Sequence, residues 1–147
     1  MNLFGVMEVS GSALKAERIR AEVVAANMAN AETTRTAEGG PYRRQHVVFS
    51  SATAEPSSFA GQLMSQADPQ MGGVNVSAVV QDPASTLRRY DPSHPDADKD
   101  GYVSYPDINP LTEMVDLMGA TRAYGLNSSA IQATKGMINS SLDILKS

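Results

Sequence analysis

The sequence predicts an α+β fold in which two long terminal helices pair and a small β-rich segment lies between them. Small and apolar residues recur at alternating steps of four and three from Leu3 to Ala31, and again from Leu117 to Leu145. Such steps place each set on one face of a helix. Between the two stretches the period changes to the alternation that strands show. We therefore expect an antiparallel, coiled-coil pair of terminal helices.

The composition excludes several classes of protein. A length of 147 residues suits one domain, and the formal net charge of −4 without a basic cluster argues against a nucleic-acid partner. The chain has no cysteine, so it has neither disulfides nor thiolate metal ligands. No apolar run is long enough for membrane insertion. The first residues lack a basic segment, and Glu8 interrupts their apolar stretch, so we expect no cleaved signal peptide.

The repeated positions predict which helix faces meet. The expected helix-pair seam consists of Leu3, Met7, Leu14, Val24, Leu117, Tyr124, Ile131, Ile138, Leu142 and Leu145. Each helix carries a second stripe, which we expect to contact neighbouring subunits: Val6, Val9, Asn27, Asn30, Ala123, Leu126, Ala130, Ala133 and Met137. In the alternative, both stripes are buried inside one chain.

The last helix has a clear start signal. Asn109 suits the N-cap, Pro110 suits the first helical position, and Glu113 favours the positive end of the helix dipole. Three glycines further along the helix each cost about 1 kcal/mol relative to alanine. The helix therefore needs a packing partner.

The middle of the chain predicts short strands and turns. We expect strands at 42–49, 74–80, 86–90 and 102–105, with a flexible loop over 50–73. The expected domain organisation is a discontinuous domain of paired helices, 1–30 with 109–147, and a β-rich segment at 31–108.

An acidic stretch raises the possibility of calcium binding. Asp96, Asp98 and Asp100 precede Gly101 at the spacing of a calcium loop, and Asp107 occupies the twelfth position. Prolines before the loop prevent the incoming helix that an EF-hand requires. The bland interpretation is a turn whose carboxylates accept backbone N–H groups. A calcium-regulated binding module using residues 96–107 is therefore only the alternative function, and we expect no metal or other cofactor.

Catalytic signals are weak in this chain. His46 and His94 are its two histidines, and no serine, threonine or second histidine stands in a recognisable triad. The sequence also has no glycine-rich phosphate loop. We therefore expect a protein that is not an enzyme.

Several motifs together resemble a known family. They are Ala26-Asn27-Met28-Ala29-Asn30, Tyr42-Arg43-Arg44-Gln45, the stretch from Tyr90 to Val103, and Pro110 to Tyr124. In these the chain resembles the flagellar basal-body rod proteins of the proximal-rod type. The resemblance implies a structural subunit of the drive shaft that transmits torque and whose terminal helices line the export channel.

The same resemblance implies partners and a location. The expected partners are other flagellar rod proteins, the basal adaptor protein, further copies in a helical assembly and the flagellar type III export apparatus. The expected location is the basal-body rod, where it crosses the periplasm.

Overall fold

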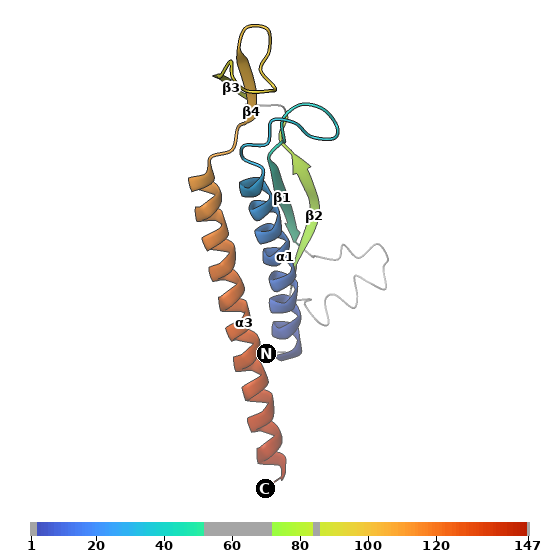
Figure 1. The fold of residues 1–147 in the computed structure, drawn as a ribbon. Helices are drawn as coiled ribbons and strands as arrows, with labels where there is room; N and C mark the ends of the chain where they lie inside the picture. Colours follow the sequence, from blue (N-terminus) through green and yellow to red (C-terminus); the bar gives the residue numbers. More distant parts are fainter. Residues whose placement is uncertain (1–2, 52–71, 84–85, 147) are drawn as a thin grey trace, which may run out of the picture. The chain divides into compact units, whose positions relative to one another are not determined.

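A computed structural model of the chain describes residues 3–51, 72–83 and 86–146 (Figure 1). Its elements are, in order, α1 (Leu3–Ala29), β1 (Gln45–Ser51), β2 (Val74–Gln81), β3 (Thr86–Tyr90), β4 (Tyr102–Pro106) and α3 (Pro110–Lys146). Two long terminal helices with a small β segment between them confirm the predicted α+β class.

Helix α3 begins where its start signal predicts. The Asn109 Oδ1 accepts a hydrogen bond from the Leu111 amide at 3.0 Å, and the Glu113 amide donates to the Asn109 carbonyl at 3.1 Å. Pro110 occupies the first helical position, where an N–H would have no intrahelical acceptor. The N-cap therefore fixes where the helix starts.

The helices run antiparallel where they touch. Arg20 of α1 bonds Asp116 of α3, whereas Asn27, further along α1, bonds Glu113, which lies earlier in α3. The order of contacts reverses between the helices, as an antiparallel pair requires. Coiled-coil packing along the whole pair stays a prediction.

The strands form two separate ribbons. β1 pairs with β2, and β3 pairs antiparallel with β4 in a register that places Tyr90 opposite Tyr102. The four predicted strands are confirmed, although β1 begins at Gln45 instead of Tyr42. β1 also extends through Ser51, so the first two residues of the expected 50–73 loop belong to a strand. Residues 52–71 of that loop lie outside the described residues.

The described chain divides into two compact units. One contains residues 3–18, 49–51, 72–77 and 121–146, and the other contains 19–48, 78–83 and 86–120. Each unit combines part of the terminal helices with part of the middle segment, and the expected domain organisation stays a prediction. Within one unit, α1 bonds the first ribbon: the Val74 amide donates to the Ser12 Oγ at 3.0 Å.

The most buried residues of α3 are not members of the predicted seam. Its buried residues are Glu113, Ala120 and Thr134, which are separated by whole heptads. Leu117, Ile131 and Ile138 of the predicted seam are half-buried beside this line, as are Leu3, Met7 and Leu14 on α1, and Val24 is buried. Ala120 and Thr134 are small side chains, whereas Glu113 is a large buried side chain that is held by hydrogen bonds.

Three predicted seam residues are exposed in the described structure. Tyr124, Leu142 and Leu145 are 44%, 49% and 82% exposed, so their place in a helix-pair seam stays a prediction. Tyr124 lies to one side of the packed face. For Leu142 and Leu145 helix length adds a reason, because α3 has 37 residues and α1 has 27. About ten residues of α3 therefore have no counterpart on α1.

The second stripes are only partly free for neighbouring subunits. Leu126, Ala133 and Met137 are exposed, which leaves them available. Asn27 is 1% exposed and its side chain bonds within the chain, which does not favour its expected role as a subunit contact. The remaining members are half-buried: Val6, Val9, Asn30, Ala123 and Ala130.

The turn between β3 and β4 requires a glycine. Gly101 has φ +79°, and a Cβ added there would lie 2.9 Å from the Tyr90 Cε2. We expect Gly101→Ala to lower the free energy of unfolding by about 1–3 kcal/mol, through backbone strain and the contact with Tyr90. Thermal unfolding followed by circular dichroism measures the change.

Gly136 provides the matched control. It lies within α3, and a Cβ there would meet nothing within 4 Å. Gly136→Ala should therefore stabilise the chain by up to about 1 kcal/mol. Equal effects of the two substitutions would contradict the assignment of Gly101 as a required turn glycine.

Candidate functional site

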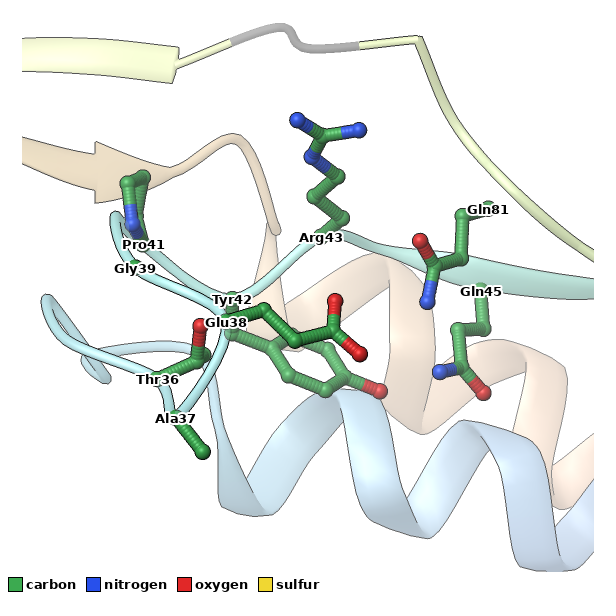
Figure 2. Close-up of a pocket in the computed structure, with 9 residues that line it drawn as sticks. All are labelled: Thr36, Ala37, Glu38, Gly39, Pro41, Tyr42, Arg43, Gln45 and Gln81. Atoms are coloured by element: carbon green, nitrogen blue, oxygen red, sulfur yellow. The ribbon is translucent and has the colours of Figure 1, made fainter.

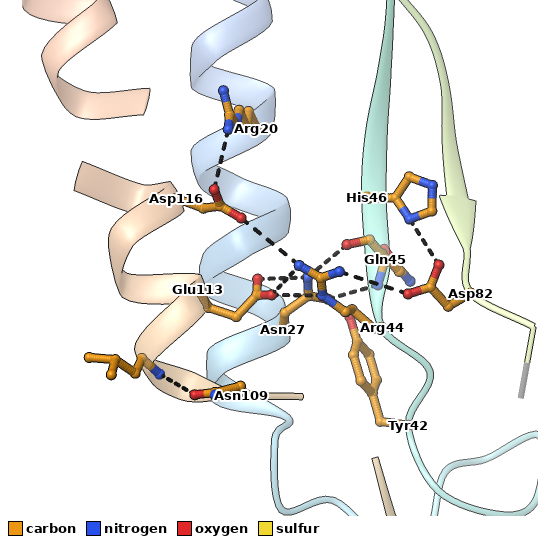
Figure 3. Close-up of polar contacts among 11 residues, drawn as sticks. Arg20, Asn27, Tyr42, Arg44, Gln45, His46, Asp82, Asn109, Glu113 and Asp116 are labelled. Carbon is orange, nitrogen blue, oxygen red and sulfur yellow. Dashed lines mark hydrogen bonds and ion pairs between the residues drawn. The ribbon is translucent and has the colours of Figure 1, made fainter. Parts of the chain in front are cut away.

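Asn27 lies at the centre of a buried polar cluster near the end of α1 (Figure 3). Its Nδ2 donates to the Gln45 carbonyl at 2.7 Å and to the Glu113 Oε2 at 3.0 Å. Its Oδ1 accepts from the Gln45 amide at 2.9 Å and from the Tyr42 hydroxyl at 3.2 Å. These four bonds use the full hydrogen-bonding capacity of the amide.

With its two bonds to the Gln45 backbone, the Asn27 side-chain amide takes the place of a peptide group on a neighbouring strand. It both donates to and accepts from the same backbone residue, as a paired peptide group does across a ladder. Gln45 is the first residue of β1. Asn27 thereby fixes the position of β1 against α1, and this explains why β1 begins at Gln45.

Glu113 contributes a buried negative charge to the cluster. Its side chain is 1% exposed, and its Oε1 accepts from the Arg44 Nε and Nη2, each at 2.7 Å. The hydrogen bond and charge of Glu113 raise the pKa of Arg44, so the arginine stays protonated. A buried carboxylate is costly to desolvate unless it is paired and fully bonded, and here both of its oxygens are.

A partly exposed rim of charges surrounds the pair in Figure 3. Arg44 approaches Asp82 and Asp116 at 3.9 Å each, and Arg20 contacts Asp116 at 3.4 Å. The His46 Nδ1 lies 3.1 Å from Asp82. Half-exposed ion pairs contribute little individually. Their alternation of sign nevertheless favours one relative position of α1, α3 and the β1–β2 ribbon.

Tyr42 seals the cluster from the side of the preceding loop. Its hydroxyl donates to Asn27, and its amide donates to the Thr33 carbonyl at 3.0 Å. Burial, and then the nearby negative charge of Glu113, raise the pKa of Tyr42, so its phenol stays a donor. We call Asn27, Tyr42, Arg44, Gln45 and Glu113 the junction.

The second asparagine of the motif shapes the end of α1. The Asn30 Nδ2 donates to the Ala26 carbonyl at 2.9 Å, and its Oδ1 accepts from the Thr33 hydroxyl at 3.1 Å. The next residue, Thr34, donates to the Asp96 Oδ2 at 2.8 Å. The motif thus ends the helix and positions Thr33 for its bond to Tyr42, and Thr34 bonds the loop between β3 and β4.

The acidic loop does not form a cation cage. Asp96 bonds Thr34 and pairs with Arg35, and the Asp98 Oδ1 accepts the amides of Asp100 and Tyr102 at 2.9 and 2.8 Å. Within the described residues, no three His, Cys, Asp or Glu side chains gather so that they could hold a metal ion. The carboxylate of Asp98 accepts backbone N–H groups, as the bland interpretation predicts.

The sequence indicated that the residues of the junction matter, but it did not predict that they contact one another. Asn27 and Asn30 stood out as a motif, and Tyr42, Arg44 and Gln45 as another. Glu113 was interpreted only as a helix-dipole residue. A usable signal was Asn27 itself, a polar residue within a stripe otherwise rich in valine and alanine, which predicts a satisfied buried amide.

Comparisons with known proteins connect these features to flagella. Residues 7–35 match the family model "Flagella basal body rod protein", and residues 99–144 match "Flagellar basal body rod FlgEFG protein C-terminal". Neither α1, α3 nor any other helix within the described residues has the length and apolarity of a membrane span.

Curated relatives match over nearly the whole chain. The chain is 43% identical to the flagellar basal-body rod protein FlgC of Bacillus subtilis, over 99% of this chain and 100% of the relative. It is 40% identical to that of Borreliella burgdorferi, over 99% of both chains. It is 33% identical to that of Salmonella typhimurium, over 98% of both chains. The matched stretches include every junction residue.

Replacing Asn27 tests the junction. Asn27→Asp keeps the shape of the side chain but removes both donated bonds and places a second carboxylate beside Glu113. We expect the free energy of unfolding to fall by about 2–4 kcal/mol. Chemical denaturation measures it, with Asn75→Asp on the exposed side of β2 as control. Similar losses in the two variants would contradict a central role for Asn27.

Acid should loosen the turn that Asp98 holds. Its bonds from the Tyr102 and Asp100 amides, with the charge of Arg88, lower the pKa of Asp98 below its ordinary 3.8. A lowered folded-state pKa means that the carboxylate's stabilising effect is present above about pH 4 and is lost as the pH falls below 3.8 through the folded value.

Nuclear magnetic resonance can follow this titration. We expect the Tyr102 amide shift to change with a midpoint below pH 3.8 in the natural chain. Asp98→Asn keeps the acceptor oxygen but has no titrating group, so its Tyr102 amide should not show this change. A midpoint at or above 3.8 in the natural chain would count against the Asp98 geometry.

Proposed function

Because the chain belongs to the FlgC family of flagellar basal-body rod proteins, we propose that it is a structural subunit of the flagellar rod. In this proposal it polymerises through its terminal helices in the proximal rod, transmits torque and lines part of the export channel. Its neighbours are other rod proteins, the basal adaptor protein and further copies of itself, and it leaves the cell through the flagellar export apparatus.

The observation that carries the assembly role is an exposed apolar face of α3, which the described part of the chain leaves uncovered. Its members are Leu111, Val115, Met118, Leu126, Met137 and Ile144, which are between 50% and 74% exposed. At about 100° per residue they fall within an arc of roughly 100°. We call this set the outer stripe. Its arc lies apart from the packed face that contains Glu113, Ala120 and Thr134.

An exposed stripe of this kind favours association. Soluble monomers rarely leave a long contiguous apolar face in water, and such faces mark interaction sites. The exposed fractions are large at both ends of the helix, at Leu111 and at Ile144. Contacts along the stripe that join unlike surfaces of successive copies would continue without closing, as a rod requires.

The junction supports the mechanical part of the proposal. A subunit that transmits torque must keep its helices in one register under load. The junction bonds α1, α3 and β1 to one another through neutral and charge-assisted hydrogen bonds around Glu113. Sliding one helix past the other would separate a buried carboxylate from its partners, which is strongly unfavourable.

Polar substitutions in the outer stripe test the proposal. Val115→Asp or Leu126→Asp should block rod assembly and swimming in a bacterium that lacks its own copy of this protein. The isolated chain should keep its melting temperature, because both side chains are more than 60% exposed. Swimming halos on soft agar and the composition of purified basal bodies measure the effect.

The control uses a polar position on the same helix. Gln132 is exposed and lies outside the outer stripe, so a bacterium that carries Gln132→Asp should swim normally. Normal swimming and normal basal bodies in both stripe variants would refute assembly through this face. Failure of the natural chain itself to restore swimming would refute the rod role.

A further inference from the structure

A polar pocket lies beside the loop that precedes β1. It has a volume of about 370 Å³, and its lining includes Thr36, Glu38, Arg43, Gln45 and Gln81 (Figure 2). In Figure 2 the Glu38 carboxylate points toward the two glutamine side chains, and Arg43 rises from the adjoining stretch of chain. Most of its lining side chains are polar, which does not suit an apolar ligand.

Two opposite charges at this pocket have no partner among the described residues. Glu38 and Arg43 are both exposed, and neither forms an ion pair or a side-chain hydrogen bond within the described part of the chain. Neighbouring arginines behave differently: Arg44 is bonded to Glu113 and Arg35 pairs with Asp96. The pocket therefore offers the Glu38 carboxylate as an acceptor and the Arg43 guanidinium as a donor to another molecule.

The pocket is held by an ordered turn. The Thr36 amide donates to the Gly40 carbonyl at 2.9 Å, and the Gly39 amide donates to the Thr36 carbonyl at 3.1 Å. Gly39 and Gly40 have φ of +88° and +79°, which side chains with a Cβ rarely adopt. A turn closed in this way loses little conformational freedom when it binds.

The chain also carries a matching element, the turn from Asp98 to Gly101. Its tip presents Lys99 and Asp100, which are exposed and whose side chains have no partner within the described residues. The Gly101 amide donates to the Asp98 carbonyl at 3.0 Å, and the Asp98 carboxylate holds the Asp100 and Tyr102 amides. The ordered turn therefore presents a cationic side chain, Lys99, next to an anionic one, Asp100.

We propose that the Lys99–Asp100 turn of one copy docks into the Glu38–Arg43 pocket of the next copy, with Lys99 pairing with Glu38 and Asp100 pairing with Arg43. The amides of Gln45 and Gln81 would then bond the peptide groups of the turn. The inference rests on the proposed rod function and adds a second, polar contact between subunits. It joins two different surfaces of the chain, so it propagates along an assembly instead of closing a dimer.

Such a contact sets orientation more than strength. Each pair is exposed to solvent, so each contributes only weakly to affinity and is screened by salt. Complementary charges nevertheless select one register and penalise others. The outer stripe would then supply most of the affinity, and the pocket would decide how neighbouring subunits align.

Charge exchange tests the docking directly. Glu38→Lys and Lys99→Glu should each weaken self-association of the purified chain about threefold or more at low salt, because each places like charges opposite one another. The double variant should return to within about twofold of the natural chain. Sedimentation over a concentration series measures association, and swimming of a bacterium that depends on each variant provides the second readout.

The control is a charge reversal at a position outside the pocket. Glu32 is exposed and lies outside the pocket, so Glu32→Lys combined with Lys99→Glu should not restore association. The three substituted positions, Glu32, Glu38 and Lys99, are all exposed, so circular dichroism should show unchanged folding. The docking is supported if Glu38→Lys restores the association of the Lys99→Glu variant and Glu32→Lys does not.

Several outcomes would overturn it. The docking would be refuted if the natural chain did not associate in a concentration-dependent manner. It would also be refuted if the single variants associated normally, or if the double variant did not regain association. An effect of Glu38→Lys without an effect of Lys99→Glu would assign the pocket to another occupant, such as a glycan. If the natural chain restores swimming in these cases, the rod function stands without the docking.

Discussion

The buried carboxylate of Glu113 is the constraint around which the described structure is organised. A charge with 1% exposure is tolerated only where partners surround it, and here Arg44 and Asn27 satisfy both oxygens. Because Arg44 directly precedes β1 and Asn27 belongs to α1, satisfying one charge positions three elements. The helix register, the start of β1 and the path of the loop before it follow from this requirement.

The rest of the packing is too modest to fix the arrangement by itself. The buried apolar residues in the described chain are Ala16, Val24, Val103, Ile108 and Ala120, and all of them except Val24 are either alanines or lie outside the helices. Apolar burial is non-directional and would tolerate several helix alignments. A fully satisfied polar network has one good geometry and is penalised in all others. We infer that the junction supplies specificity, and that burial of the outer stripe in an assembly supplies much of the stability.

The sequence predicted the local structure well for particular physical reasons. Asn109 and Pro110 mark the start of α3 because capping chemistry is local, and the alternation after Val74 marks β2 because one ribbon face is half-buried. The heptad pattern located the helices, but the most buried residues of α3 are not those of the predicted seam. Leu142 and Leu145 fit the repeat and are exposed, whereas Glu113, Ala120 and Thr134 define the packed face.

The candidate site was harder to predict because it depends on contacts distant in sequence. Asn27 and Glu113 are 86 residues apart, and no periodic pattern links an amide to a carboxylate. The motif around Asn27 indicated importance without stating why. Its physical meaning became clear only when β1 and α3 were placed beside it, because the same amide serves both.

Hydrogen exchange at the Gln45 amide tests the central claim most directly. This amide donates to the Asn27 Oδ1, outside any helix and at the first position of a two-stranded ribbon. If the junction couples the elements, the Gln45 amide should exchange with the same opening free energy as the helix amides of Val24 and Asp116, because all three open together. An opening free energy near that of exposed loop amides, while the two helices stay protected, would contradict the account.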